Sequence, residues 1–204
     1  MKLKVCGMKF PENIQAVSDL APDYMGFIFW EKSTRFFEGE IPKLPLNIKK
    51  TGVFVDAPME YVQKIIEKHQ LQAVQLHGIE SPEYCHQLQA SKVEIIKVFS
   101  VDAHFDFQEL EPYEDVCDFY LFDTKGKLPG GNGTVFDWDV LKQYYSPKPF
   151  FLSGGIGLDE IKKIKKMLEA DLPVYAIDVN SKFETKPGIK SIEQLKVFKR
   201  EILE

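Results

Sequence analysis

The 204-residue sequence is poor in cysteine, with three widely separated residues and no CxxC pair. This argues against a disulfide framework and a zinc knuckle, and against a thiol redox centre with a resolving partner. The four histidines lack metal-ligand spacing. We therefore expect no metal and no other cofactor, and the free cysteines favour a reducing, cytoplasmic location.

The chain also lacks an excess of positive charge. Its 26 Lys and Arg stand against 31 Asp and Glu, which gives a formal net charge of −5. No apolar run is long enough to span a bilayer, and the N-terminus does not resemble a secretory signal. We expect no nucleic-acid partner and no membrane association, although a local pocket for one small anion is compatible with this charge.

Short apolar segments alternate with amphipathic ones along the whole chain. Val17 shares a helical face with Ile14, and Ser191 with Gln194 forms a capping box before the last helix. The expected strands are residues 3–6, 24–29, 51–55, 73–76, 93–99, 119–123, 150–153 and 174–179. The second and fifth helices are weak, because Pro42 and Pro45 leave room for little more than a turn after the second strand.

Strand–helix alternation predicts the α/β class, with parallel strands and right-handed crossovers. Eight units favour closure into a (β/α)8 TIM barrel with a single domain over residues 1–204. An open doubly wound sheet is the alternative that periodicity leaves open. In a barrel, chemistry belongs at the C-terminal ends of the strands.

Two strand ends carry groups suited to acid–base chemistry. Cys6 ends the first strand and shares a face with Lys4, whose ammonium favours a thiolate. The alternative is a small buried hydrophobic residue. Asp123 ends the sixth strand, where an apolar barrel mouth would raise its pKa and suit a general acid. The alternative interpretation is that Asp123 only caps the loop that follows the strand.

Other strand ends suggest anion binding. Arg35 follows the second strand and could hold a carboxylate or phosphate, or be a solvated loop residue. The loops after the seventh and eighth strands are suited to bind one phosphate together. These loops contain Gly154, Gly155, Asn180 and Ser181. The alternative is that the loops are only two tight turns, which would also explain the glycines. His77 ends the fourth strand, where a hydrogen-bonding core residue is the favoured interpretation. The glycine-rich residues 124–133 form a loop that could close over a substrate.

Eight segments resemble motifs of the phosphoribosylanthranilate isomerase family, in the family's order. They are residues 4–8, 26–29 with 33–35, 52–55, 74–78, 121–124, 130–138, 152–155 and 177–181. Any one of them is a weak signal, but together they cover nearly the whole chain and are highly specific.

The resemblance implies an isomerase of tryptophan biosynthesis that needs no cofactor. Its reaction is the Amadori rearrangement of N-(5-phosphoribosyl)anthranilate to 1-(o-carboxyphenylamino)-1-deoxyribulose 5-phosphate. By family similarity, Asp123 protonates the furanose ring oxygen and Cys6 takes the C2′ proton.

The resemblance also implies the substrate contacts. Arg35 would bind the anthranilate carboxylate, and Asp178 would face the anthranilate amino group. The phosphate would lie on the loops that contain Gly154, Gly155, Asn180 and Ser181. The expected partner is thus a small phosphosugar, and the protein is expected to be a monomer or a homodimer.

The chain departs from the family pattern after Asn180 and Ser181. Lys182 stands where the family usually has a glycine, and Phe183 also precedes the Pro187-Gly188 pair. Lys182 would add positive charge near the phosphate.

Three other functions compete with the isomerase. The histidine-pathway isomerase uses an aspartate where Cys6 stands, and pentose-phosphate epimerases commonly use a metal for which no ligand cluster is evident. A non-catalytic phosphosugar-binding barrel would not need both Cys6 and Asp123, so their joint presence favours an enzyme.

Overall fold

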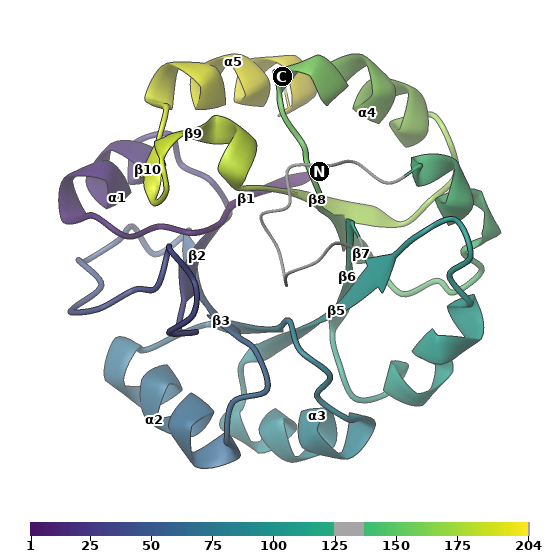
Figure 1. Ribbon diagram of the computed structural model, residues 1–204, viewed down its shortest axis with the longest axis horizontal. Coiled ribbons are helices and arrows are strands. Elements are labelled where there is room, and N and C mark those ends of the chain that lie inside the picture. The colour runs from purple at the N-terminus through teal and green to yellow at the C-terminus, as the bar shows by residue number, and fades with distance from the viewer. Residues whose placement is uncertain (125–136, 204) are drawn as a thin grey trace.

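The chain forms a closed barrel of parallel strands in the order β1-β2-β3-β4-β5-β6-β7-β8 (Figure 1). The computed structural model describes residues 1–124 and 137–203. The strands are β1 Lys2–Val5, β2 Tyr24–Ile28, β3 Lys49–Phe54, β4 Ala73–Leu76, β5 Glu94–Val101, β6 Phe119–Thr124, β7 Phe150–Leu152 and β8 Val174–Val179. β1 pairs with β8 and closes the ring, so the (β/α)8 prediction is confirmed and the open sheet is wrong.

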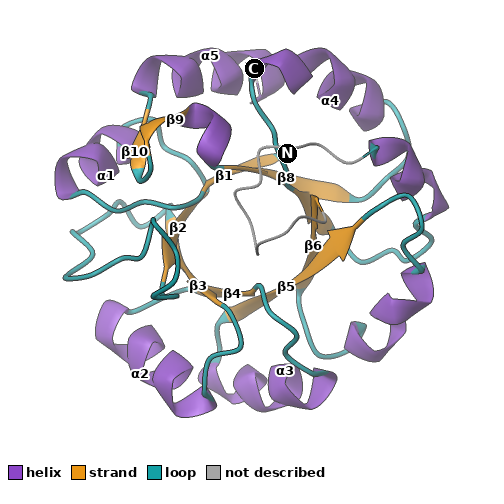
Figure 2. Cartoon of the chain, viewed as in Figure 1, coloured by secondary structure: helices purple, strands orange, loops and turns teal. Residues whose placement is uncertain are grey.

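Helices surround the strands as an outer layer (Figure 2). The α-helices are α1 Pro11–Ser18, α2 Met59–His69, α3 Pro82–Leu88, α4 Ile161–Leu168 and α5 Ile192–Leu203. Short 3-10 helices are η1 Gln89–Ser91, η2 Phe107–Tyr113, η3 Trp138–Gln143, η4 Leu158–Glu160 and η5 Ser181–Phe183. The Ser191 hydroxyl accepts a 3.4 Å hydrogen bond from Gln194 N, as its capping position predicts. Residues 29–48 contain no helix, in agreement with the weak pattern there.

Side chains alternate between two packed layers. Leu3 and Val5 point outward into the core beneath the helices, together with Ile14 and Val17 of α1. An apolar cluster fills the inside of the barrel and consists of Tyr24, Ala73, Ile96, Val98, Leu121, Phe151 and Ala176. Two residues further along their strands, toward the C-terminal end, stand Asp123 and Asp178. The polar site therefore begins where the apolar plug ends.

A small antiparallel hairpin follows β8 and was not predicted. It consists of β9 Glu184–Lys186 and β10 Ile189–Lys190, and Gly188 in its turn has a φ of +83°. Its strands are too short to show period-two alternation. The hairpin carries Glu184 toward the loop after β2, which is important for the site.

Two further observations complete the fold. No helix in the described ranges is long and apolar enough to cross a bilayer. Beyond Thr124, the glycine-rich loop predicted to close over a substrate lies outside the described residues.

Candidate active site

Cys6, Lys4 and Asp178 meet inside the barrel on the adjacent strands β1 and β8. Lys4 and Asp178 are direct neighbours in the strand register, and Lys4 Nζ donates a 2.9 Å hydrogen bond to Asp178 Oδ2. Both side chains are buried, and Asp178 Oδ1 has no hydrogen-bond partner among the described residues. Burial is the largest single influence and disfavours the Lys4 ammonium, but the charges of Asp178 and Cys6 and the hydrogen bonds to them together outweigh it and raise the Lys4 pKa. One carboxylate oxygen thus remains available to a ligand.

The Cys6 thiol is 4% exposed and faces the same space. Burial raises its pKa; Lys4 and Lys190 oppose this shift, and Asp178 adds to it. The Lys4 ammonium does favour the thiolate, as predicted, but desolvation of the thiolate by burial is the larger effect and sets the direction of the shift. A Cβ on Gly26 would lie 2.7 Å from Cys6 Sγ, so the neighbouring strand needs glycine to make room for the thiol.

Asp123 faces His77 across the C-terminal rim of the barrel. Asp123 Oδ2 lies 3.2 Å from His77 Nε2, and its Oδ1 accepts a 2.8 Å hydrogen bond from Thr124 N. Gln75 Nε2 lies 3.1 Å from His77 Nδ1, so an amide donor there leaves the ring proton on Nε2. Nε2 lies within ion-pair distance of Asp123 but makes no hydrogen bond with a described residue. Asp123 therefore both restrains the start of its loop and presents a carboxylate oxygen to the site.

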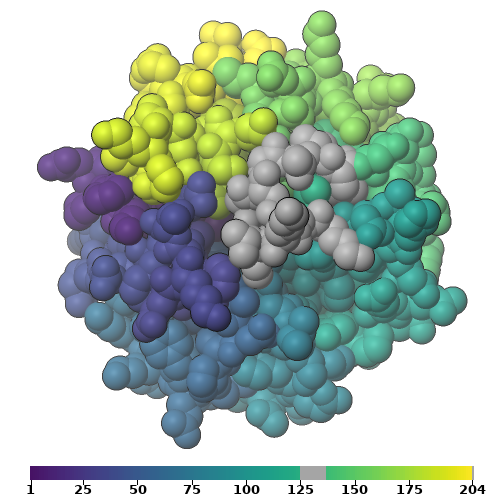
Figure 3. Space-filling model, in the orientation of Figure 1, coloured from purple at the N-terminus to yellow at the C-terminus, as the bar shows by residue number. Residues whose placement is uncertain are grey.

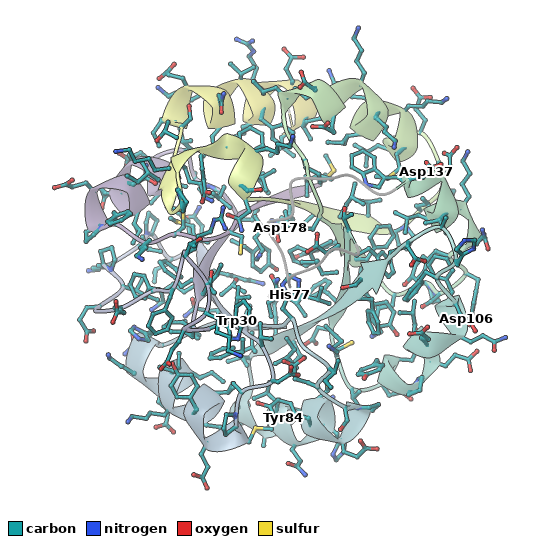
Figure 4. All side chains as sticks on the ribbon, in the orientation of Figure 1. Trp30, His77, Tyr84, Asp106, Asp137 and Asp178 are labelled. Carbon is teal, nitrogen blue, oxygen red and sulfur yellow. The ribbon has the colours of Figure 1, made fainter. Side chains whose placement is uncertain are left out.

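The Lys4–Asp178 pair and the His77–Asp123 pair belong to one site. Burial raises the pKa of Asp178, and the charges of Lys4, Asp123 and His77 all act on it. In Figure 4 the Asp178 and His77 labels lie over the barrel interior, whereas Tyr84, Asp106 and Asp137 lie over the outer layer. The structure thus brings Cys6, Asp123 and Asp178 to one barrel mouth, as predicted.

The predicted phosphate loops are neighbours at the same end. Gly154 and Gly155 have φ values of +92° and +63°, and a Cβ on Gly154 would lie 3.0 Å from Asp123 Oδ1. Lys182 Cβ lies 3.2 Å from the position of a Cβ on Gly157, which joins the loops after β7 and β8. Gly157 N already donates a 2.7 Å hydrogen bond to Glu160 Oε2. The N–H groups before Gly157 are therefore the better candidates for an anion.

Arg35 is not the solvated loop residue of the alternative interpretation. Its guanidinium is 15% exposed and donates to Glu184, with Nη2 2.6 Å from Oε2. Lys190 Nζ lies 2.7 Å from Glu184 Oε1 and 2.6 Å from Asn180 Oδ1. The chain from Arg35 through Glu184 and Lys190 to Asn180 thus joins a predicted carboxylate site to a predicted phosphate loop.

Three members of the site were not predicted from the sequence. His77 was assigned to the core, although its position at the end of β4 was a usable signal. Glu184 and Lys190 gave no signal, because they reach the site through the hairpin. Across the described ranges, no group of three or more His, Cys, Asp or Glu side chains could hold a metal ion.

Comparisons with known proteins assign this arrangement to a family. The model of the N-(5'-phosphoribosyl)anthranilate isomerase family matches residues 3–201. The chain belongs to this family. The family prediction, and the isomerase activity predicted with it, are thereby confirmed.

Individual relatives agree along the whole chain. It is 42% identical to N-(5'-phosphoribosyl)anthranilate isomerase of Parabacteroides distasonis over 210 residues, covering 100% of this chain and 94% of the relative. The crystal structure of phosphoribosyl anthranilate isomerase from Thermus thermophilus matches with a TM-score of 0.85 at 26% identity, covering 98% of both chains. A phosphoribosyl anthranilate isomerase in complex with reduced 1-(o-carboxyphenylamino)-1-deoxyribulose 5-phosphate matches with a TM-score of 0.82 at 27% identity, covering 99% of this chain and 98% of the other.

Proposed function

We propose that this chain isomerises N-(5'-phosphoribosyl)anthranilate in tryptophan biosynthesis, with Asp123 as the general acid and Cys6 as the general base. The observation that supports these roles best is the position of both groups at one end of one barrel. Each has a distinct environment: Asp123 faces an imidazole, and Cys6 is enclosed beside a buried ion pair. An acid and a base held around one sugar are what the rearrangement requires.

In this reaction the protein supplies and removes protons only. Asp123 gives its proton to the furanose ring oxygen, the bond between C1′ and this oxygen breaks, and a Schiff base forms. Cys6 removes the C2′ proton, and the electron pair of that C–H bond forms the enolamine, which tautomerises to the ketone. Substrate and product are isomers, so no oxidant or reductant is consumed.

The groups proposed to bind the substrate lie at the same end of the barrel as the acid and the base. We infer that Asp178 Oδ1, which has no hydrogen-bond partner among the described residues, accepts the anthranilate N–H, and that Arg35 binds the carboxylate. The phosphate lies on the backbone N–H groups of the loops with Gly154, Gly155, Asn180 and Ser181, beside Lys182. Binding energy from the unreactive phosphate holds the sugar between the acid and the base.

A direct assay tests the proposed function. Phosphoribosylanthranilate is generated in situ, and the loss of its fluorescence is followed with and without the protein. The product must have the mass of the substrate, and borohydride must add two hydrogens to it, as expected for a ketone. A decay equal to that of the protein-free sample would contradict the proposed function.

Location and assembly complete the proposal. We infer a cytoplasmic enzyme that acts on a small phosphosugar, since its three cysteines are free and buried. Light scattering would distinguish the predicted monomer from the homodimer.

A further inference from the structure

The contact between Arg35 and Glu184 determines which part of the guanidinium remains for a ligand. Arg35 Nε donates to Glu184 Oε1 at 2.9 Å and to Oε2 at 3.0 Å, and Nη2 donates to Oε2 at 2.6 Å. Glu184 therefore covers the Nε–Nη2 edge. A guanidinium has five N–H donors, and those of Nη1 make no hydrogen bond with another described residue. The terminal Nη1–Nη2 edge is thus available to a second carboxylate in bidentate geometry.

The Glu184 side chain is fixed by further hydrogen bonds besides those from Arg35. Its side chain is 4% exposed, and its Oε1 accepts hydrogen bonds from Lys190 Nζ at 2.7 Å and from Gly188 N at 3.0 Å. Burial raises the Glu184 pKa, but the hydrogen bonds from Arg35, Lys190 and Gly188 and the charge of Lys190 together outweigh it and hold the pKa below its usual value. Glu184 is therefore a fixed anion at neutral pH.

Lys190 extends the network to the loop after β8. Its Nζ, which is fully buried, donates to Asn180 Oδ1 at 2.6 Å and approaches Asn180 O at 3.3 Å. Gly7, directly after Cys6, has a φ of +75°, and a Cβ there would lie 2.6 Å from Asn180 Oδ1 and 2.8 Å from Arg35 Cδ. Arg35 and Asn180 thus converge on the backbone beside the thiol. Figure 3 shows the surface of the loop after β8 next to that of the loop after β2.

We propose that Glu184 is a positioning residue that presents the terminal edge of Arg35 to the substrate carboxylate and, through Lys190, fixes the distance from Arg35 to the phosphate loop. This inference rests on the proposed function, because that function supplies a substrate with a carboxylate at one end and a phosphate at the other. Without Glu184, the Arg35 side chain would sample several rotamers, and binding would have to order them.

The test is a double-mutant cycle of Glu184→Gln and Arg35→Met. Glu184→Gln should raise KM about ten-fold and lower kcat much less, because an aligned Arg35 binds ground and transition states alike. In the Arg35→Met background the same change should alter KM by less than about two-fold, because its effect passes through the guanidinium. Equal effects of Glu184→Gln in both backgrounds, or wild-type kinetics of the single variant, would overturn the inference.

Matched controls separate positioning from folding. Glu193→Gln removes an exposed glutamate of α5 that pairs only with Lys196 among the described residues, and it should leave KM and kcat unchanged. If Glu184→Gln does not fold, Glu184→Asp replaces it; the shorter carboxylate should keep the fold and still raise KM, and an unchanged KM would overturn the inference. Loss of all activity in the wild type would instead contradict the proposed function, before any variant is compared.

Discussion

His77 Nε2 lies 3.2 Å from Asp123 Oδ2, with His77 at the end of β4 and Asp123 near the end of β6. The other oxygen of Asp123 is held by the N–H of Thr124. One carboxylate oxygen is therefore tied to the backbone while the other faces the site. The amide of Gln75, 3.1 Å from Nδ1, orients the imidazole so that its Nε2 faces this second oxygen.

Asp123→Asn should lower kcat by about 10²–10⁴-fold, the usual contribution of a general acid. The amide keeps the shape and can accept the Thr124 hydrogen bond, but it cannot deliver a proton. Steady-state kinetics check this. The matched control is Asp118→Asn, at the residue directly before β6, whose carboxylate accepts the N–H of Ile95. A wild-type kcat in Asp123→Asn would return Asp123 to the loop-capping interpretation.

Cys6→Ala should abolish turnover and leave the protein folded. Loss of one small buried group should cost about 1 kcal/mol or less of unfolding free energy. A thermal melt beside an assay measures both effects. Cys117→Ala removes a thiol that is also buried but lies outside the site, so it should lose similar stability and keep activity. Unchanged activity per folded Cys6→Ala molecule would make Cys6 structural.

The pH dependence of kcat/KM should reflect the enclosed thiol. Because burial raises the Cys6 pKa, the active thiolate of the free enzyme is populated only as the pH rises through the alkaline range. We expect kcat/KM to increase with pH above neutrality, up to the raised thiol pKa. If kcat/KM instead reaches its plateau at a pH below the pKa of an ordinary thiol, the charges of Lys4 and Lys190 outweigh the effect of burial on the Cys6 pKa.

Lys4→Met should destabilise the fold strongly, because it leaves Asp178 buried without its cation. Breaking a buried pair on one side typically costs about 3–5 kcal/mol. The control is Lys2→Met, on the same strand. Lys2 pairs with Asp23 at 2.7 Å, but both side chains are partly exposed. This substitution should therefore lower the free energy of unfolding by about 1 kcal/mol or less. Urea unfolding of both variants gives the comparison. Equal losses would mean that Lys4 is not the counter-ion that keeps Asp178 charged.

The fold was predictable because its signal is local. Each strand is a short apolar run, and the strand ends at Cys6, Asp123 and Asp178 followed from the barrel alone. The partner of Arg35 was not predictable, since Glu184 lies 149 positions away and reaches it through a short hairpin. The sign of the Cys6 pKa shift was also out of reach, because sequence shows the neighbour Lys4 but not the degree of burial.

Lys182 provides the last prediction, at the position where the chain departs from the family pattern. Its side chain is exposed, its Cβ lies against Gly157, and it makes no ion pair with a described residue. A cation there should strengthen phosphate binding by Coulomb attraction that salt weakens. Lys182→Ala should therefore raise the inhibition constant of inorganic phosphate by about three- to ten-fold at low salt, which corresponds to a surface interaction of roughly 1 kcal/mol. Lys186→Ala changes an exposed lysine of β9, in the hairpin that follows η5, and should leave this constant unchanged. Equal constants for wild type and Lys182→Ala at low salt would place the anion on backbone N–H groups alone.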